Sequence, residues 1–250
     1  MGQLDGKVAL ITGAGRGFGR ATAECFSEAG ASLVLNYRAS RDGCEEVAAS
    51  ARALGQQAIT VQADVTDGLA VEAMVARAID EFGRIDILVN NAGIMFHEEF
   101  PESSEEHWRQ EMEVNVFGPL RVTHAVAPQM IAQGWGRIIN ISSQLALVGW
   151  PRGAVYSGTK GFILSWTKSL AREFGQHGVT VNAIGPGSII TDMNANVYPD
   201  EDAKRRRMAE LPLRRFGSPR DVGECALFLA SDAGGFLTGQ MLGPNGGNVM

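Results

Sequence analysis

Short runs of apolar and β-branched residues alternate along this chain with longer segments in which apolar residues recur at helical spacing. The short runs predict strands at residues 8–11, 33–35, 58–62, 85–89, 137–141 and 179–184, and the longer segments predict helices at 20–28, 41–54, 69–82, 104–133 and 156–174. A late helix is expected after Ser218-Pro219-Arg220-Asp221, which combines a capping serine, a proline at the first helical position and an early acid.

The alternation of strand and helix determines the expected architecture. A strand that returns through a helix to the next strand makes a parallel sheet with right-handed crossovers, and strands that are apolar throughout are typical of a sheet covered on both faces. We therefore predict a single α/β domain over residues 1–250, a doubly wound parallel sheet with helices on both faces. The longest stretch without a clear pattern, 188–216, is expected to form a lid over the substrate.

Composition narrows the classes of function. The net charge of −6 argues against non-specific nucleic-acid binding, which needs a basic face. No run approaches the roughly 20 apolar residues that span a bilayer, and the N-terminal residues lack the basic-then-apolar pattern of a secretory signal. The three cysteines are too widely spaced to suggest a metal site or a disulfide framework. The sequence thus predicts a cytoplasmic protein without a metal site, which binds neither nucleic acid nor membrane.

A glycine-rich loop follows the first predicted strand. Residues 12–19 read Thr-Gly-Ala-Gly-Arg-Gly-Phe-Gly, which has the spacing T-G-x-x-x-G-x-G rather than G-x-G-x-x-G. Glycines between a strand and a helix permit a tight turn, and the helix N-terminus then offers N–H groups and a positive dipole end to a pyrophosphate. Because many turns are rich in glycine, it is the position between strand and helix that favours a dinucleotide site.

The end of the second predicted strand bears on the choice of cofactor. NAD-preferring folds usually place an acid there to bind the ribose 2′-hydroxyl, but this chain has Asn36, Tyr37 and Arg38. Arg38, together with Arg16 of the glycine-rich loop, could instead pair with a 2′-phosphate. The alternative is that both are ordinary surface arginines. We expect NADP(H) to be preferred over NAD(H).

Two more polar segments follow predicted strands. Asp64 could accept a hydrogen bond from an adenine amine, or it could cap the helix that begins near Leu69. Residues 90–93, Asn-Asn-Ala-Gly, end the fourth predicted strand, at the carboxyl edge where open α/β sheets bind ligands. Both segments are therefore expected near the cofactor.

Tyr156 and Lys160 stand four residues apart on a predicted helix, so they share one of its faces. An ammonium beside a phenol favours the phenolate and lowers the phenol pKa, which would make the tyrosine a proton donor or acceptor near neutral pH. The pair alone does not distinguish this role from an exposed helical pair.

Two other residues give the pair a chemical context. Ser143 ends a predicted strand thirteen residues before Tyr156, and its hydroxyl could donate to a substrate oxygen and share the developing charge. Asn115 lies inside a predicted long helix, where asparagine is a poor helix former. It would kink that helix and hold a water near Lys160, unless it is a surface asparagine.

Together these motifs resemble the short-chain dehydrogenase/reductase family over nearly the whole chain, from Lys7 to about Gly247. The matching motifs are Thr12-Gly13 with Gly17 and Gly19, residues 90–93, Asn115, Ser143, Tyr156 with Lys160, Asn182-Ala183-Ile184-Gly185-Pro186-Gly187, and the tail 239–247. The sequence is most similar to the β-ketoacyl-acyl carrier protein reductase branch. The resemblance implies a Rossmann-like fold, a nicotinamide cofactor and a homotetramer.

The resemblance also implies a role for each matching residue. Tyr156 would be the acid/base, and Lys160 would lower its pKa and hold the nicotinamide ribose. Ser143 would polarise the substrate carbonyl, and Asn115 would carry a water in a proton relay. The residues expected at the cofactor are Gly13, Gly15, Arg16, Gly17, Phe18, Gly19, Tyr37, Arg38, Asp64, Val65, Asn91, Ala92, Gly93, Tyr156, Lys160, Pro186, Gly187, Ile189 and Thr191.

The substrate is less well defined. Reductases of carrier-bound substrates place basic residues before the fifth strand and after the Tyr/Lys helix, and the matching positions here hold Gln133-Gly134-Trp135 and His177. We therefore expect a free small ketone, aldehyde or secondary alcohol, with docking of a carrier protein disfavoured. A largely apolar pocket is expected from Met95, Phe96, Gln144, Leu145, Trp150, Ser188 and Met193. Trp150 and Met193 could instead pack in the core or at a subunit interface.

Several alternatives stay open beside a hydride-transferring oxidoreductase of a fairly apolar substrate. One is a β-ketoacyl-acyl carrier protein reductase of fatty acid synthesis. A cofactor-sensing protein without chemistry is disfavoured because all four expected catalytic residues are present, and enoyl reductases space the tyrosine and lysine more widely. Epimerases of this fold carry a larger C-terminal domain. The basic run 204–207, Lys-Arg-Arg-Arg, predicts a solvated helix face, with contact to a substrate anion as the alternative.

Overall fold

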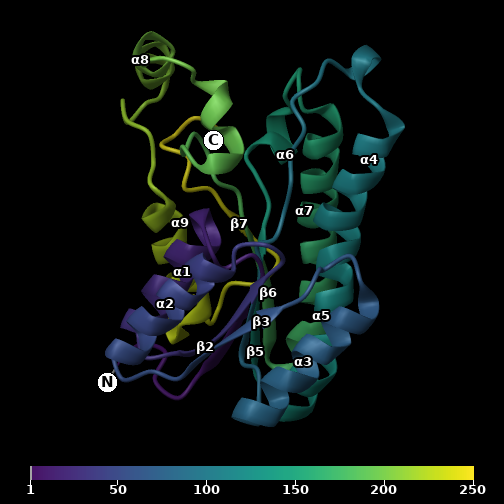
Figure 1. Cartoon of the computed structure of the whole chain (residues 1–250), viewed down its shortest axis with the longest axis vertical. Coiled ribbons are helices and arrows are strands. Elements are labelled where there is room, and N and C mark those ends of the chain that lie inside the picture. The colour runs from purple at the N-terminus through teal and green to yellow at the C-terminus, as the bar shows by residue number, and fades with distance from the viewer. Residues whose placement is uncertain (1) are drawn as a thin grey trace.

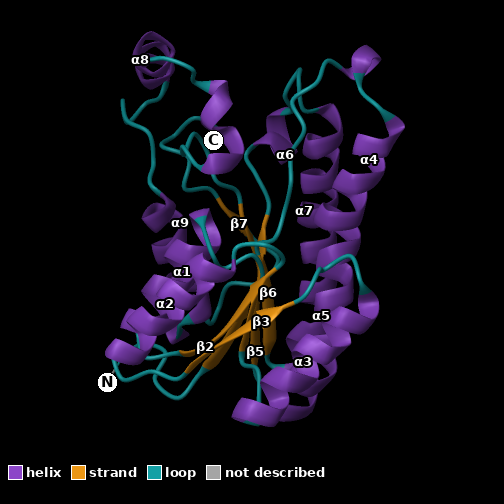
Figure 2. Ribbon diagram, viewed as in Figure 1, coloured by secondary structure: helices purple, strands orange, loops and turns teal. Residues whose placement is uncertain are grey.

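Seven parallel strands form the central sheet, in the order β3-β2-β1-β4-β5-β6-β7. The computed structural model describes residues 2–250, apart from the side chains of residues 194–196. The strands are β1 (Val8–Ile11), β2 (Ser32–Tyr37), β3 (Ala58–Gln62), β4 (Ile87–Asn90), β5 (Gly136–Ile141), β6 (Val179–Ile184) and β7 (Met241–Leu242). Each neighbouring pair is parallel, so the predicted doubly wound sheet is confirmed (Figures 1 and 2).

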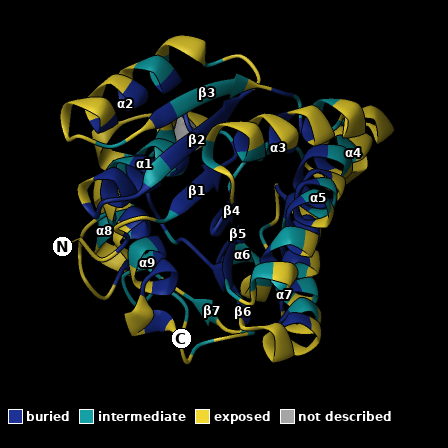
Figure 3. Cartoon of the chain, turned by 90° about the horizontal axis from the view of Figure 1, so that it is seen from below, coloured by how far each residue is buried: buried dark blue, intermediate teal, exposed yellow. Residues whose placement is uncertain are grey.

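Helices cover both faces of this sheet. On one side lie α1 (Gly17–Glu28), α2 (Arg41–Ala53) and α9 (Pro219–Ala230); on the other lie α3 (Gly68–Phe82), α4 (Glu105–Met112), α5 (Gly118–Gln133) and α7 (Ala154–Phe174) (Figure 1). Successive strand residues point to opposite faces. Ala9 and Ile11 join the core under the first set, whereas Val8 and Leu10 join the core under the second. The central strands β1, β4 and β5 are buried along their whole length, whereas the edge strands β3 and β7 are mostly half-buried (Figure 3).

The expected helix at 104–133 is interrupted. Between α4 and α5 the chain forms a π-helical turn at Glu113–Phe117, with Asn115 at its centre. A π turn holds one residue more than an α turn and is frequent at functional sites. The helix is thus interrupted at Asn115, where the sequence predicted a kink. The predicted start of the last helix is also confirmed, since Ser218 and Asp221 form a capping box.

The segment at 188–216 has more regular structure than the sequence indicated. It contains a 3₁₀ helix at Asp192–Val197 and the helix α8 (Glu201–Glu210). α8 stands beyond the carboxyl ends of the strands, across from α6 (Leu145–Val148) in the view of Figure 1. The sequence did not predict α8, because the helix consists mostly of polar residues and shows no apolar residues at helical spacing.

The order of strands locates the ligand-binding edge. β1 pairs with β2 on one side and with β4 on the other. From β1 the chain first builds β2 and β3 outward on one side, and it then returns to place β4 on the other side of β1. Open α/β sheets bind ligands beyond the carboxyl ends of the strands at such a switch point. Within the part of the chain that the structure describes, no helix is long and apolar enough to cross a membrane.

Candidate active site

A cavity of about 630 Å³ opens at the carboxyl edge of the sheet, between the strand ends and the segment 188–216. It brings together residues from both halves of the chain. Every predicted site residue lines it except Gly19, Asn115 and Phe96. Gly19 and Asn115 lie directly behind the wall, whereas the ring of Phe96 stacks on His107 outside the cavity.

The glycines of the glycine-rich loop permit a backbone path that other residues would not. Gly13 and Gly17 have φ of +64° and +55°, which favour glycine. A Cβ on Gly19 would lie 2.4 Å from the Gly13 carbonyl oxygen and 2.5 Å from Asn91 Nδ2. Arg16 is the N-cap residue of α1, and its side chain accepts no hydrogen bond from the helix. The first N–H groups of α1 are therefore not capped by a side chain, and the residues that carry them line the cavity. This arrangement suits a pyrophosphate.

Asn91 supports this loop from behind. Its Nδ2 donates to the carbonyl oxygens of Thr12 at 2.8 Å and Gly13 at 3.1 Å. On the other side, the Gly13 N–H donates to Asn36 Oδ1 at 3.3 Å. The side-chain amides of the buried Asn36 and the half-buried Asn91 therefore hold the loop in place between β1, β2 and β4. The sequence predicted that Asn91 contacts the cofactor, and it did not indicate this supporting role.

The two arginines predicted to bind a 2′-phosphate face the cavity in ion pairs. Arg38 Nη1 lies 3.8 Å from Asp64 Oδ2, and Arg16 Nη1 lies 3.6 Å from Asp192 Oδ2. Both arginine side chains are about two-thirds exposed, at 65% and 68%. Exposed ion pairs contribute little free energy, so either arginine can exchange its partner for a stronger anion.

Asp64 does not cap the following helix. Its Oδ1 accepts from the N–H and hydroxyl of Thr66, and the N-cap of α3 is Asp67, which accepts from Leu69 and Ala70. The capping alternative for Asp64 is therefore wrong. Ser40 is a cavity residue that the sequence analysis missed: it precedes α2 but makes no side-chain cap, and it lies beside Arg38 in the wall.

Tyr156 and Lys160 are buried at the other end of the cavity. Lys160 Nζ donates to the Ile141 carbonyl oxygen at 2.8 Å and lies 5.6 Å from the centre of the Tyr156 ring. Ser143 makes a side-chain hydrogen bond with Tyr156. The exposed-pair alternative for Tyr156 and Lys160 is wrong, since the helix face that they share is turned into the site.

The pKa of Tyr156 departs from the predicted direction. Burial raises it to about 12; the hydrogen bond from Ser143 lowers it, and the charge of Glu111 raises it. Burial also lowers the pKa of Lys160 to about 8, against the charge of Glu111. The phenol is therefore protonated at neutral pH in the free protein. The expected lowering by Lys160 does not appear, because desolvation of the phenol dominates and the ammonium points at Ile141.

Asn115 is fully buried rather than a surface residue. Its Oδ1 accepts from the Ile94 N–H at 2.9 Å, and its Nδ2 donates to the Ile94 carbonyl oxygen at 2.9 Å. A Cβ placed on Gly93 would lie 3.2 Å from Asn115 Oδ1 and 3.6 Å from Lys160 Nζ. The side chains of Asn115, at the centre of the π turn, and of Lys160 thus reach the same small space beside Gly93.

Glu111 was not predicted as a site residue. It is only 3% exposed, and its Oε1 accepts from the Phe96 N–H at 2.8 Å. Burial raises the pKa of the Glu111 carboxyl, and its charge acts on both Tyr156 and Lys160. The available signal was an acid four residues before Asn115, on the same face of the predicted helix.

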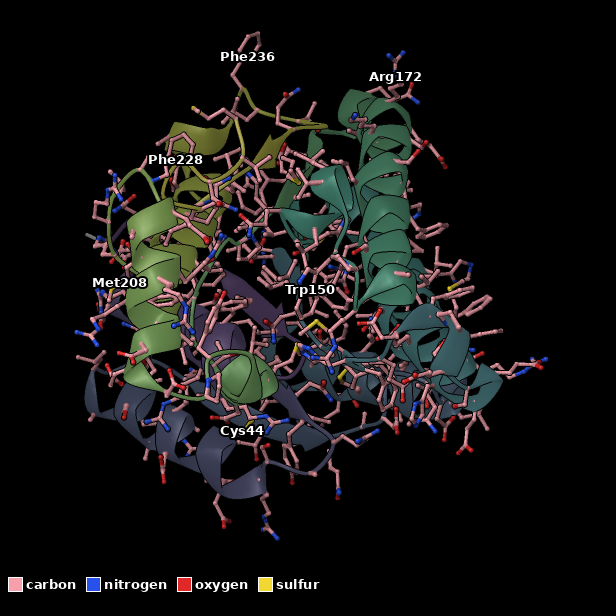
Figure 4. All side chains as sticks on the ribbon, turned by 90° about the horizontal axis from the view of Figure 1, so that it is seen from above. Cys44, Trp150, Arg172, Met208, Phe228 and Phe236 are labelled. Carbon is pink, nitrogen blue, oxygen red and sulfur yellow. The ribbon has the colours of Figure 1, made fainter. Side chains whose placement is uncertain are left out.

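The substrate end of the cavity has an apolar and a polar wall. The apolar wall includes Met95, Leu145, Val148, Trp150 and Met193. Figure 4 looks down on this end of the molecule, with Trp150 near the middle and α8, marked by Met208, toward one edge. The polar wall consists of Gln144, Ser188, Arg207 and Asn248. Asn248 comes from the C-terminal tail and had no signal in the sequence.

Metal chemistry has no candidate among the described residues, since no three of their His, Cys, Asp and Glu side chains are grouped to hold an ion. The described side chains instead form one continuous site, with a glycine cradle and two arginines at one end and Ser143, Tyr156 and Lys160 at the other.

Known proteins match the chain along its whole length. A family model described as enoyl-(acyl carrier protein) reductase matches residues 13–248. The chain is 38% identical over 244 residues to the 3-oxoacyl-[acyl-carrier-protein] reductase FabG of Staphylococcus epidermidis, covering 98% of this chain and 99% of that protein. It is 39% identical over 251 residues to the 3-oxoacyl-[acyl-carrier-protein] reductase of Synechocystis sp., covering 100% of both.

Solved structures match the fold as closely. A putative short-chain alcohol dehydrogenase from Sinorhizobium meliloti superposes with a TM-score of 0.93 at 36% identity, covering 98% of this chain and 97% of that one. A putative NAD(P)-dependent gluconate 5-dehydrogenase from Beutenbergia cavernae, with bound NADP, superposes with a TM-score of 0.92 at 35% identity and the same coverage.

Proposed function

We propose that this chain, which belongs to the short-chain dehydrogenase/reductase family as an oxidoreductase of carbonyl and alcohol groups, reduces the carbonyl of a free small molecule with NADPH. The observation that carries the proposal is that Ser143, Tyr156 and Lys160 share one cavity with the glycine cradle. The four-residue spacing of Tyr156 and Lys160 favours a carbonyl over an enoyl substrate.

The residues divide the chemical step between them. The nicotinamide, when bound, supplies the hydride to the carbonyl carbon. Tyr156 donates its phenolic proton to the carbonyl oxygen, and its pKa of about 12 keeps that proton in place at neutral pH. Ser143 donates a hydrogen bond to the same oxygen and shares its developing charge. Lys160 would hold the nicotinamide ribose, and Asn115 would help to return a proton to Tyr156 through the space at Gly93.

The cofactor choice rests on the far end of the cavity. β2 ends without an acid that would repel a 2′-phosphate. Arg38 and Arg16 are held there only by exposed ion pairs, and the hydroxyl of Ser40 lies in the same wall. Two arginines and a hydroxyl match the charge and the acceptors of a phosphate. These features support NADPH over NADH.

The remaining proposals concern partners and location. A homotetramer is supported by aromatic side chains exposed in the single chain, such as the fully exposed Phe236 (Figure 4) and, on α7, the 38% exposed Phe162, which stacks on the half-buried Trp166. The segment 188–216 would act as a lid, since it forms one wall of the cavity. The three free cysteines agree with a reducing cytoplasm.

A second candidate is reduction of a carrier-bound β-ketoacyl group, which the named relatives favour. Against it, the positions where basic residues would be expected hold Gln133-Gly134-Trp135 and His177. Lys7 does lie over the Trp135 ring at 3.8 Å, so this surface carries some charge. If docking is absent, a short free thioester should be reduced as well as the same acyl group on intact carrier protein. A carrier preference of about a hundredfold, equivalent to about 2.7 kcal/mol, would favour the second candidate.

A panel of ketones, aldehydes and alcohols, assayed by nicotinamide absorbance with both cofactors, tests the main proposal. Tyr156→Phe should lower kcat at least about 10²-fold while the cofactor still binds, because it removes the proton donor. Tyr198→Phe is the matched control, since Tyr198 lines the same cavity but packs against Phe216 and has no part in the proposed chemistry. Near-normal turnover by Tyr156→Phe would contradict the assignment.

A further inference from the structure

Arg207 differs from its basic neighbours in the direction of its side chain. Lys204, 33% exposed, pairs with Glu201 at 2.6 Å, and Arg205, 72% exposed, pairs with Asp202, so both side chains bond to acids of α8 itself. The Arg207 side chain is only 21% exposed, and its Nε donates to Ser188 Oγ at 2.9 Å in the wall of the cavity. One arginine of the solvated run is thus turned inward.

The guanidinium of Arg207 keeps donors for a further acceptor. Its Nη1 lies 2.8 Å from Glu210 Oε2, and no described residue accepts from Nη2. The Glu210 side chain is 63% exposed, and such solvated pairs contribute little. Glu210 is therefore a weak competitor for any anion that enters the cavity.

The charges lining the cavity leave Arg207 without an acidic partner there. Asp64 and Asp192 are the acids among the described lining residues, and each pairs with an arginine at the cofactor end. Lys160 Nζ donates to the Ile141 carbonyl oxygen at the catalytic end, where its remaining donors would hold the nicotinamide ribose. Arg207 is thus a lining cation whose acidic partner, the exposed Glu210, does not itself line the cavity.

Two amides, those of Gln144 and Asn248, line the same cavity as Arg207. Asn248 Nδ2 donates to Gln144 Oε1 at 3.0 Å, which leaves the NH₂ group of Gln144 as its remaining donor. Gln144 directly follows Ser143, and its N–H donates to the Pro186 carbonyl oxygen at 3.1 Å. The amide is therefore held next to the serine that would bind the reacting carbonyl.

We infer that the substrate carries a carboxylate, which Arg207 and Gln144 bind while its carbonyl lies at Ser143 and Tyr156; this deepens the proposed carbonyl reduction and rests on it. The planar fork of an arginine matches a carboxylate. One positive charge with neutral amide donors suits a singly charged acid better than a phosphate dianion. The apolar wall of Leu145, Trp150 and Met193 packs the body between the two groups. The substrate class is thus an oxo-acid, or the corresponding hydroxy-acid, with an apolar middle.

Matched substrates test this inference. Linear methyl-ketone acids of increasing chain length are compared with their methyl esters, which keep the carbonyl and lose the charge. The measured quantity is the acid-to-ester ratio of kcat/KM in the wild type, Arg207→Ala, Arg207→Lys and Arg206→Ala. Arg206 is the matched control, because it neighbours Arg207 in the run but is exposed and does not line the cavity.

We expect the wild type to prefer the acid by about tenfold or more at its best chain length, the scale of one charge-assisted hydrogen bond. The ratio should fall to near one in Arg207→Ala, stay intermediate in Arg207→Lys, which keeps the charge without the fork, and remain high in Arg206→Ala. Arg207→Lys also keeps the test valid if the alanine variant folds poorly.

Three results would overturn the inference. The wild type could reduce esters as well as acids at every length, or reduce simple ketones but no oxo-acid. The ratio could also fall equally in Arg206→Ala and Arg207→Ala, which would indicate a diffuse field rather than a site. A wild type that reduces no carbonyl of any kind would instead count against the proposed function itself, so the two failures are distinguishable.

Discussion

Replacing Arg38 by alanine is the sharpest test of cofactor choice. Arg38 lines the cavity at the end of β2 and pairs with Asp64 at 3.8 Å. A charge-assisted contact with the 2′-phosphate contributes about 1.5–3 kcal/mol. Because the Arg38 side chain is 65% exposed, we take the lower end, about 1.5 kcal/mol, which corresponds to about tenfold in kcat/KM for NADPH.

The loss should exceed that of the contact alone. Without Arg38, the Asp64 carboxylate would stand unpaired beside the phosphate and repel it. NADH lacks the phosphate, so its kcat/KM should change by no more than about threefold, the scale of an exposed ion pair. Arg38→Asp should reverse the preference. Position 38 tolerates an acid better than position 37, because Tyr37 is buried.

The assay is initial-rate kinetics with both cofactors on one carbonyl substrate. Arg41→Ala is the control, since Arg41 opens α2 three residues later but does not line the cavity. It removes the same charge from the same region. A wild type that prefers NADH, or an Arg41→Ala variant that loses NADPH activity as strongly as Arg38→Ala, would refute the assignment and return Arg38 to an ordinary surface charge.

Three further outcomes follow from the packing of the site and the helices. Gly19→Ala should weaken cofactor binding at least about tenfold, because its Cβ would meet backbone at 2.4 Å; Gly68→Ala, where a Cβ meets nothing within 4 Å, should bind normally in the same fluorescence titration. Glu111→Gln keeps the acceptor for Phe96 and removes the charge that raises the Tyr156 pKa, so the alkaline limb of the reduction pH profile should move to lower pH; a limb that stays or moves upward would exclude this coupling. Ser218→Ala should cost about 1 kcal/mol of unfolding free energy through loss of the α9 cap, measured by denaturant titration.

The order of elements and the cofactor cradle were predictable because they depend on local patterns. Apolar runs at strand length and helical spacing reflect burial on one or two faces, and that information lies within each segment. Glycine is likewise required at 13 and 17 by positive φ, and at 19 by close contact with the Gly13 carbonyl oxygen and Asn91. The serine, tyrosine and lysine were identifiable because their spacing fits one strand end and one helix face.

The tertiary structure alone decided how these residues are charged and what surrounds them. The direction of the Tyr156 pKa depends on burial and on Glu111, which reaches the site from another helix. Likewise, the sequence grouped Arg207 with the other basic residues of a predicted solvated face, and only the packing of α8 against Ser188 turns it inward. Asn248 enters the cavity from 104 residues away in sequence from its partner Gln144. Desolvation and long-range contact are properties of the folded chain as a whole, so no local pattern records them.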